Sequence, residues 1–87
     1  MELIIYFENK QIVELRLMRD GRNLDMLMVP IDIHFDTVLV TSIDKLLKRN
    51  RIDPLSLGGV SVTGQTDQSS VAYHIACSVA AAIKSLN

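Results

Sequence analysis

The sequence predicts one α/β domain whose strands and helices follow the order βββαβα. Two apolar segments near the amino terminus, residues 3–7 and 12–18, are rich in residues that favour strands. Asp20 and Gly21 form a dipeptide typical of a two-residue hairpin turn. Two later segments, residues 36–50 and 69–86, have the spacing of apolar residues expected of helices, and a short strand over 57–63 separates them. These observations predict a mixed sheet with two helices packed on it.

The composition is that of an ordinary globular domain without an excess of either charge. The 87 residues are 48% hydrophobic and 22% charged, with a net charge of −1. Nucleic-acid binding usually needs a basic surface, so direct contact with nucleic acid is not expected. No apolar run is long enough to cross a membrane, and the first strand begins directly after Met1 without a signal peptide. With a single cysteine, Cys77, the chain has no internal disulfide, and we expect a cytoplasmic protein.

The hairpin at the Asp20-Gly21 turn is predicted to have a simple register. Counting back from the turn places Arg19 opposite Arg22 and Leu17 opposite Leu24. The same count places Leu15 opposite Met26, Val13 opposite Met28, and Arg16 opposite Asp25. One face of the hairpin is then wholly apolar, and the other carries an opposite-charge pair.

The segment over residues 36–50 is expected to be the first helix, with Asp36 as its N-cap. Leu39, Ile43 and Leu46 form its apolar stripe. Residues 37–41 could instead form a strand, because Val38 is one of two β-branched valines there. The helical period continues unbroken to Leu47, which favours the helix.

The final helix, residues 69–86, is unusual because it contains a single charged residue, Lys84. One apolar stripe is expected to lie on the sheet, and it consists of Val71, Ile75, Val79, Ala82 and Leu86. A second stripe lies on nearly the opposite side of the helix. It consists mostly of small residues that let another helix approach closely, and its members are Tyr73, Cys77, Ala80, Ala81 and Lys84. The first helix of the same chain covers one flank, and we expect the second stripe to be an interface with a partner.

The turn over residues 64–70 is the one place where the sequence suggests a ligand. It precedes a helix, where free backbone N–H groups attract anions, and it begins with Gly64, Gln65, Thr66 and Asp67. A single glycine gives the backbone little freedom to wrap a phosphate, and Asp67 would repel one. Capping of the helix by Asp67 or Ser69 is the favoured interpretation.

No spacing of residues indicates catalysis, a metal site or a cofactor. His34 and His74 lie far apart, without a carboxylate or cysteine at the spacing of metal ligands. Cys77 has no cation beside it and is predicted to pack rather than to react. The chain is therefore expected not to be an enzyme.

In the order and length of its segments, the whole chain resembles the N-terminal lobe of the TsaB (YeaZ) family. The resemblance rests on a strand and hairpin, a lead-in containing His34, and a helix ending Ile43-Asp44-Lys45-Leu46-Leu47. It continues through Ile52-Asp53-Pro54-Leu55-Ser56-Leu57-Gly58-Gly59-Val60-Ser61-Val62 to an alanine-rich helix ending Lys84-Ser85-Leu86-Asn87. The resemblance implies an RNase H-like fold, one half of an actin-like ATPase, with residues 1–87 forming a single lobe.

The departures from the family pattern lie in its two phosphate-binding loops. After the first strand the chain has Glu8-Asn9-Lys10 in place of an Asp-Thr-Ser-like loop. Of the family's glycine-rich loop only Gly64 is clearly retained, so residues 64–67 are a degenerate phosphate loop. The second lobe, which completes the nucleotide cleft in this fold, has no counterpart. No cofactor is therefore expected.

The resemblance implies a non-catalytic interaction or scaffold protein. TsaB packs against TsaD through helices of this lobe, in the pathway that makes threonylcarbamoyladenosine (t6A) on tRNA. The expected assembly is a homodimer, or a heterodimer with a TsaD-like protein, through helices 36–50 and 69–86. The alternative is a residual nucleotide- or phosphate-binding domain that uses the turn over residues 64–70. An RNase H-like nuclease shares the element order but needs acidic metal ligands that residues 3–7 do not supply.

Overall fold

The computed structural model describes residues 1–86 of the chain. Its strands and helices are β1 (Glu2–Phe7), β2 (Ile12–Arg19), β3 (Arg22–Pro30), α1 (Phe35–Arg49), β4 (Gly59–Gly64) and α2 (Val71–Lys84). A short 3₁₀ helix, Pro54–Ser56, lies between α1 and β4. The predicted order βββαβα is confirmed, and the 3₁₀ turn is an addition to it that the sequence did not indicate.

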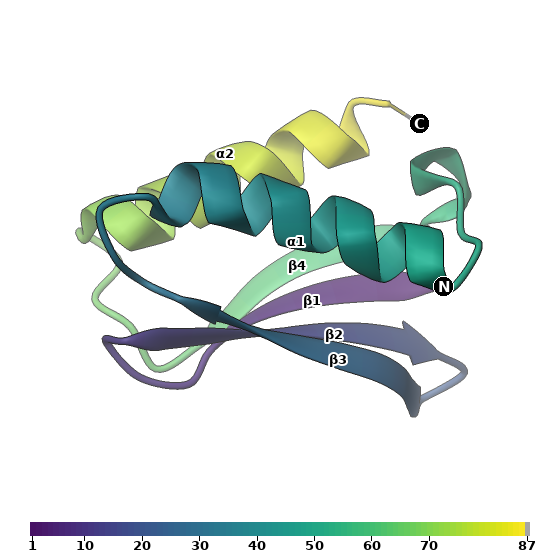
Figure 1. The fold of residues 1–87 in the computed structure, drawn as a ribbon, viewed down its shortest axis with the longest axis horizontal. Coiled ribbons are helices and arrows are strands. Elements are labelled where there is room, and N and C mark those ends of the chain that lie inside the picture. Colours follow the sequence, from purple (N-terminus) through teal and green to yellow (C-terminus); the bar gives the residue numbers. More distant parts are fainter. Residues whose placement is uncertain (87) are drawn as a thin grey trace.

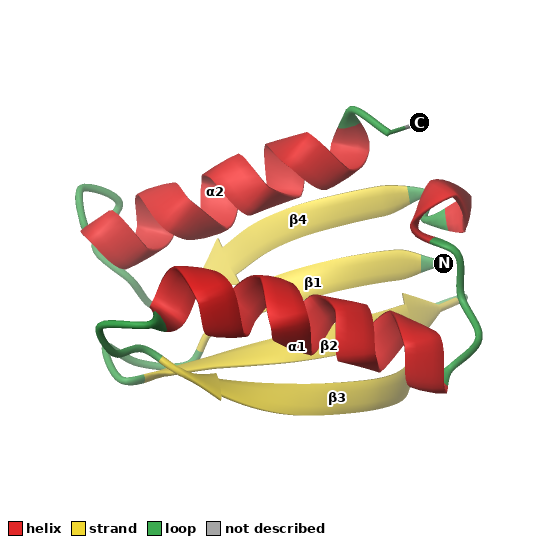
Figure 2. Cartoon of the chain, turned by 45° about the horizontal axis from the view of Figure 1, so that its top comes forward, coloured by secondary structure: helices red, strands yellow, loops and turns green. Residues whose placement is uncertain are grey.

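The strands form one mixed sheet in the order β3-β2-β1-β4. The first three strands are antiparallel neighbours, and β4 pairs parallel to β1. Both helices lie side by side on one face of this sheet, α1 towards β3 and α2 towards β4 (Figures 1 and 2). The core lies between the layers and contains Leu3, Ile5, Leu15, Leu39 and Leu46, each fully buried. This is the predicted α/β class, a mixed sheet with two helices packed on it.

The hairpin turn forms where predicted, but the predicted register is wrong beyond it. Asp20 and Gly21 both have positive φ, 52° and 77°, which a type I′ turn requires. Arg19 does face Arg22, but a bulge between Leu17 and Met18 shifts the pairing by one residue. The pairs that follow are Leu17 with Asp25, Arg16 with Met26, Leu15 with Leu27, and Val13 with Val29.

The bulge decides which side chains of β3 face the helices. A shift of one residue exchanges the two faces of a strand. Asp25, Leu27 and Val29 therefore point to the helix layer, whereas Met26 and Met28 lie on the open face and are 41% and 45% exposed. The predicted pairing of Arg16 with Asp25 does not occur.

Asp25 instead connects β3 to the end of α1. Its carboxylate accepts two hydrogen bonds from Arg49, at 2.7 and 2.8 Å, and one from the side-chain amide of Asn50 at 2.8 Å. Arg49 also donates to the Met26 carbonyl at 2.9 Å. The hydrogen bonds that Asp25 accepts from Arg49 and Asn50 hold the pKa of Asp25 well below its usual range, and the bonds from the Arg49 guanidinium are the largest cause.

The helix α1 begins one residue earlier than predicted, with His34 at the N-cap position. Asp36 is therefore not the cap but lies in the first turn, where a negative charge favours the helix dipole. Asp32 accepts a hydrogen bond from the His34 N–H at 2.8 Å and shapes the entry. The alternative strand over residues 37–41 is wrong, because that segment lies inside α1.

The helix α2 is capped by Ser70, whose hydroxyl accepts from the Tyr73 N–H at 3.2 Å. Neither Asp67 nor Ser69 holds that position. The helix is also rotated about its axis relative to the prediction, by roughly a third of a turn. Its buried residues are Ala76 and Ala80, whereas Val71, predicted to lie on the sheet, is 75% exposed. Small side chains face the strands because they let the helix approach the sheet closely.

Candidate partner-binding surfaces

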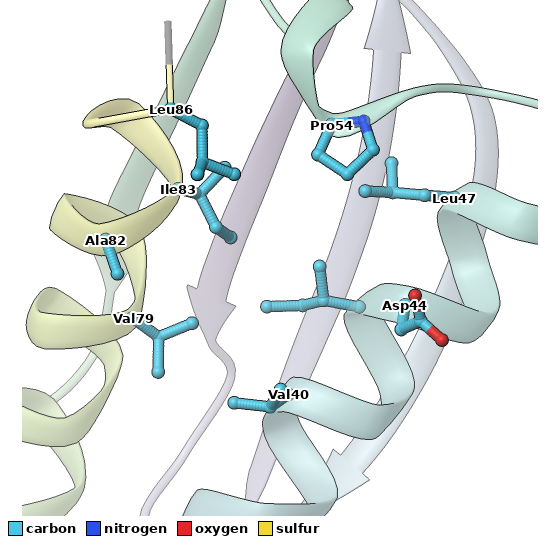
Figure 3. A pocket seen from close by; sticks show the side chains of 9 residues that line it. Val40, Asp44, Leu47, Pro54, Val79, Ala82, Ile83 and Leu86 are labelled. Atoms are coloured by element: carbon cyan, nitrogen blue, oxygen red, sulfur yellow. The ribbon is translucent and has the colours of Figure 1, made fainter.

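A groove between α1 and α2 is lined almost wholly by apolar side chains. Its volume is about 330 Å³. The residues that line it come from α1, the 3₁₀ turn, α2 and the residues just after it: Val40, Ile43, Asp44, Leu47, Pro54, Val79, Ala82, Ile83 and Leu86. Figure 3 shows Val79, Ile83 and Leu86 directed across the groove towards Val40 and Leu47. The groove therefore exposes branched side chains that two helices alone leave uncovered.

Exposure of the groove residues is high for their type. Val40 is 53% exposed and Leu86 is 54% exposed, although both are large and apolar. Among the residues that line the groove, Asp44 is the one with an ionisable side chain. Its carboxylate pairs with Lys48 at 2.9 Å, and the other lining side chains carry no charge. An apolar floor with a charged rim is the usual anatomy of a protein interface.

This groove was not predicted from the sequence, because the predicted orientation of α2 about its axis is wrong. Val79, Ala82 and Leu86 were predicted to lie on the sheet, but they line the groove beside α1. The run of alanines in α2 was the available signal. Ala76 and Ala80 are four residues apart, and the side of a helix with the smallest side chains is the one that approaches a sheet most closely.

The five residues predicted as a partner interface also come together, but on the other flank of α2. Tyr73, Cys77, Ala80, Ala81 and Lys84 line a hollow of about 260 Å³ that they share with Val62 of β4. Ala80 forms its floor and is 4% exposed, so it belongs to the core of this chain. Ala81 and Lys84 are exposed and remain available to a partner.

Tyr73 joins this hollow to the core. Its ring lies 6.2 Å from the ring of Phe7, and Phe7 in turn lies 6.4 Å from Phe35. The hydrogen bond between the phenol and Cys77 raises the pKa of Tyr73. Tyr73 and Cys77 are thus half-buried packing residues, and the predicted interface itself stays a prediction.

The degenerate phosphate loop keeps one feature that only glycine can provide. Gly64 has φ of 108°, and a Cβ there would lie 2.4 Å from the Phe7 carbonyl oxygen. Gln65 follows directly and donates its N–H to the same carbonyl at 2.7 Å. Gly64 is therefore required by the close approach of β1 and the loop, with no ligand involved.

The amides of this loop are already used within the chain. Asp67 accepts from the Ser69 N–H at 2.9 Å and from the Ser69 hydroxyl at 2.7 Å. Both hydrogen bonds lower the pKa of Asp67, and the bond from the Ser69 hydroxyl has the larger effect. The Ser70 N–H donates to the Asp67 carbonyl at 2.9 Å. A hollow of about 350 Å³ lies beside Thr66, Asp67 and Lys10, but an anion there would meet a carboxylate and find these N–H groups occupied.

Two searches of residues 1–86 gave negative results. No group of three or more His, Cys, Asp or Glu side chains lies close enough together to hold a metal ion. Neither helix in that range combines the length and the hydrophobicity that crossing a bilayer demands.

The fold of the chain was compared with those of solved structures. YeaZ from Pseudomonas aeruginosa superposes on 99% of this chain with a TM-score of 0.74. The chain has the fold of part of YeaZ. The sequences are 16% identical over the match, so the likeness to YeaZ concerns the fold.

The match to YeaZ covers less than half of that protein. This chain corresponds to 40% of the YeaZ chain. A scan against protein-family models gave no match, and a comparison with curated proteins gave none either. The predicted RNase H-like architecture is thus confirmed through its likeness to YeaZ, and the groove and the hollow described above lie on a YeaZ-like lobe.

Proposed function

We propose that this protein is a non-catalytic, TsaB-like interaction protein that binds a TsaD-like protein through α1 and α2. The observation that carries the proposal is the uncovered apolar groove between the two helices, where Val40 and Leu86 are about half exposed. A pair of helices from the partner would complete a four-helix arrangement over this groove. In such an arrangement the side chains of facing helices interdigitate, which buries the groove residues.

The phosphate loop supports a role without catalysis. Its amides are bonded to Asp67 and Phe7, which leaves them unavailable to a phosphate. A contribution to t6A biosynthesis in the cytoplasm follows from the resemblance to TsaB and is part of the proposal. In that role the chain positions or stabilises a catalytic partner and leaves the nucleotide chemistry to it.

The test is binding of the purified chain to a TsaD-like protein, measured by calorimetry and by sedimentation velocity. Val40→Glu and Ala82→Glu each place a charge in the groove at an exposed position, so the fold should tolerate them. We expect each to weaken binding at least about tenfold, because a buried unpaired carboxylate is costly. Asn23→Glu, at the exposed start of β3, adds the same charge far from the groove and is the matched control.

Absence of binding by the unsubstituted chain would overturn the proposal. Equal binding by Val40→Glu, Ala82→Glu and the control would show that the helices are not the contact. Dimerisation of the chain through the groove, lost in Val40→Glu, would replace the TsaD-like partner by a second copy.

A further inference from the structure

The apolar groove between α1 and α2 continues towards the amino-terminal ends of both helices. A second hollow, of about 400 Å³, lies beside it and shares Val40 and Val79 with it. The residues that belong to the second hollow alone all come from α1, and they are Asp36, Thr37 and Thr41. The two hollows together, here called the extended groove, follow α1 from Asp36 to Leu47, which is about 17 Å along the helix axis.

The walls of the extended groove favour a helix as its occupant. Both walls are α-helices that lie side by side, as Figure 2 shows, and their backbone groups are bonded within each helix. An extended peptide would find no strand edge there and would leave its own backbone groups unpaired. A helix satisfies its own backbone and offers only side chains, which fit between those of the two walls.

The charges along the extended groove have one sign and lie on one wall. Asp36 and Asp44 are the two ionisable side chains that line it, and both belong to α1 (Figure 3 shows Asp44). The α2 wall is uncharged, because Lys84, the one charged residue of that helix, lines the hollow on its other flank. A bound helix with cations beside its apolar stripe is therefore complementary to the groove, whereas one with carboxylates there is repelled.

Both carboxylates are available to a partner. Within residues 1–86 Asp36 has no ion-pair partner. Asp44 pairs with Lys48, but both side chains are more than half exposed. An exposed pair contributes little, so a cation of the partner can join Asp44 or take the place of Lys48.

We propose that one helix of the TsaD-like partner lies along the extended groove and carries Lys or Arg at both ends of its apolar stripe, to pair with Asp36 and Asp44. This inference rests on the proposed function and adds the chemistry of the bound segment. Cations about eight positions apart on a helix are separated by about 12 Å along its axis, as Asp36 and Asp44 are on α1. Between them, large apolar side chains at helical spacing pack against Val40 and Val79. The apolar stripe supplies most of the affinity, and the cations set the position of the helix along the groove.

Two synthetic amphipathic helices test this chemistry on the full chain without a natural partner. Both carry the same stripe of leucines over about fifteen residues, and the positions that flank the stripe are Lys in one peptide and Glu in the other. At about 50 mM salt we expect the Lys peptide to bind at least about tenfold more tightly than the Glu peptide, measured by calorimetry. In about 0.5 M salt the preference should fall below about threefold, because exposed charges are then screened.

Substitutions at the two carboxylates should change which peptide is preferred. Asp36→Lys combined with Asp44→Lys should reverse the preference, and because both side chains are exposed the fold should tolerate the change. Asp36→Asn combined with Asp44→Asn removes the charges without reversing them, so the two peptides should then bind about equally well. Glu2→Lys makes the same change of charge as Asp36→Lys, but on the face of the sheet opposite to the helices, and should keep the preference.

Equal binding of the two peptides to the unsubstituted chain, or binding of neither, would overturn the inference. A preference for the Lys peptide that survives in the Asp36→Lys and Asp44→Lys double variant would also overturn it. The proposed function fails separately, if the TsaD-like protein does not bind the chain. Binding of that protein that is weakened by Val40→Glu but not by the double variant would support the groove as the contact and contradict the basic flanks.

Discussion

Two positions in the chain require glycine for different physical reasons, one for its backbone angle alone and the other also for its close neighbours. Gly21 and Gly64 both have positive φ, 77° and 108°, where a side chain is strained. A Cβ at Gly21 would have no neighbour within 4 Å, whereas at Gly64 it would collide with the Phe7 backbone. The first glycine is required by a turn, and the second by close packing of the loop on β1.

Gly64→Ala should therefore destabilise the protein much more than Gly21→Ala. We expect a loss of about 1 kcal/mol at Gly21, from backbone strain alone. At Gly64 the strain adds to the clash, and the loss should exceed about 3 kcal/mol. Urea denaturation of both variants measures the difference, and equal losses would contradict the close approach of Gly64 to Phe7.

Asp25 should make the stability of the protein depend on pH in a defined direction. Arg49 and Asn50 hold its pKa below the usual value of 3.8. A carboxyl whose pKa is lower in the folded than in the unfolded state contributes its full stabilisation above the unfolded-state pKa. That contribution is lost progressively as the pH falls from there towards the folded-state pKa. At pH 7, Asp25→Asn should lower the free energy of unfolding by about 1–2 kcal/mol.

The difference between Asp25→Asn and the unsubstituted chain should shrink between pH 4 and pH 2, measured by urea denaturation across that range. Asp44→Asn is the control, because its pair with Lys48 is more than half exposed on both sides. Such a pair contributes little, so this variant should differ by less than about 0.5 kcal/mol. A difference for Asp25→Asn that stays constant in acid would contradict the role assigned to its charge.

At the level of the elements, the sequence predicted which segments are helices and strands but not how they are rotated. The Asp20-Gly21 turn and the helical periods identify local structure, because both depend on neighbouring residues. The bulge at Leu17 and Met18 has no comparable signal, and it exchanges the faces of β3. The rotation of α2 about its axis depends on which of its sides packs closest to the sheet. The prediction chose the side with the branched residues Val71, Ile75 and Val79, whereas the side with Ala76 and Ala80 is the buried one. The groove and the Asp25–Arg49 pair therefore could not be predicted from the sequence. The five residues predicted as an interface do line one hollow, but their role as an interface stays a prediction.

The orientation of α2 can be tested by placing a larger side chain on the side that faces the sheet and, separately, on the side that faces the groove. Ala76 is fully buried against the sheet, so Ala76→Leu should cost about 2–3 kcal/mol through overpacking. Ala82 is exposed in the groove, so Ala82→Leu should change stability by less than about 0.5 kcal/mol. Thermal unfolding of both variants measures the contrast. If Ala82→Leu were the damaging substitution, the helix would face the sheet with the stripe that the sequence analysis predicted.

At the scale of the whole molecule, both helices lie on one face of the sheet and leave its other face uncovered within residues 1–86 (Figure 2). A partner that docks on α1 and α2 would therefore leave the open face of β2 and β3 free. Substitutions on that face, such as Asn23→Glu, should leave binding at the groove unchanged.

Binding at the groove should be visible as a rise in melting temperature when a TsaD-like protein is added. A partner that binds only the folded state stabilises it, and the gain grows with the concentration of free partner. At a hundredfold excess over the dissociation constant the gain is about 2.7 kcal/mol, which for a chain of this length should raise Tm by roughly 10 °C. Val40→Glu should lose about half of this rise if its binding is tenfold weaker, whereas Asn23→Glu should keep all of it. A full rise in Val40→Glu would place the contact outside the groove.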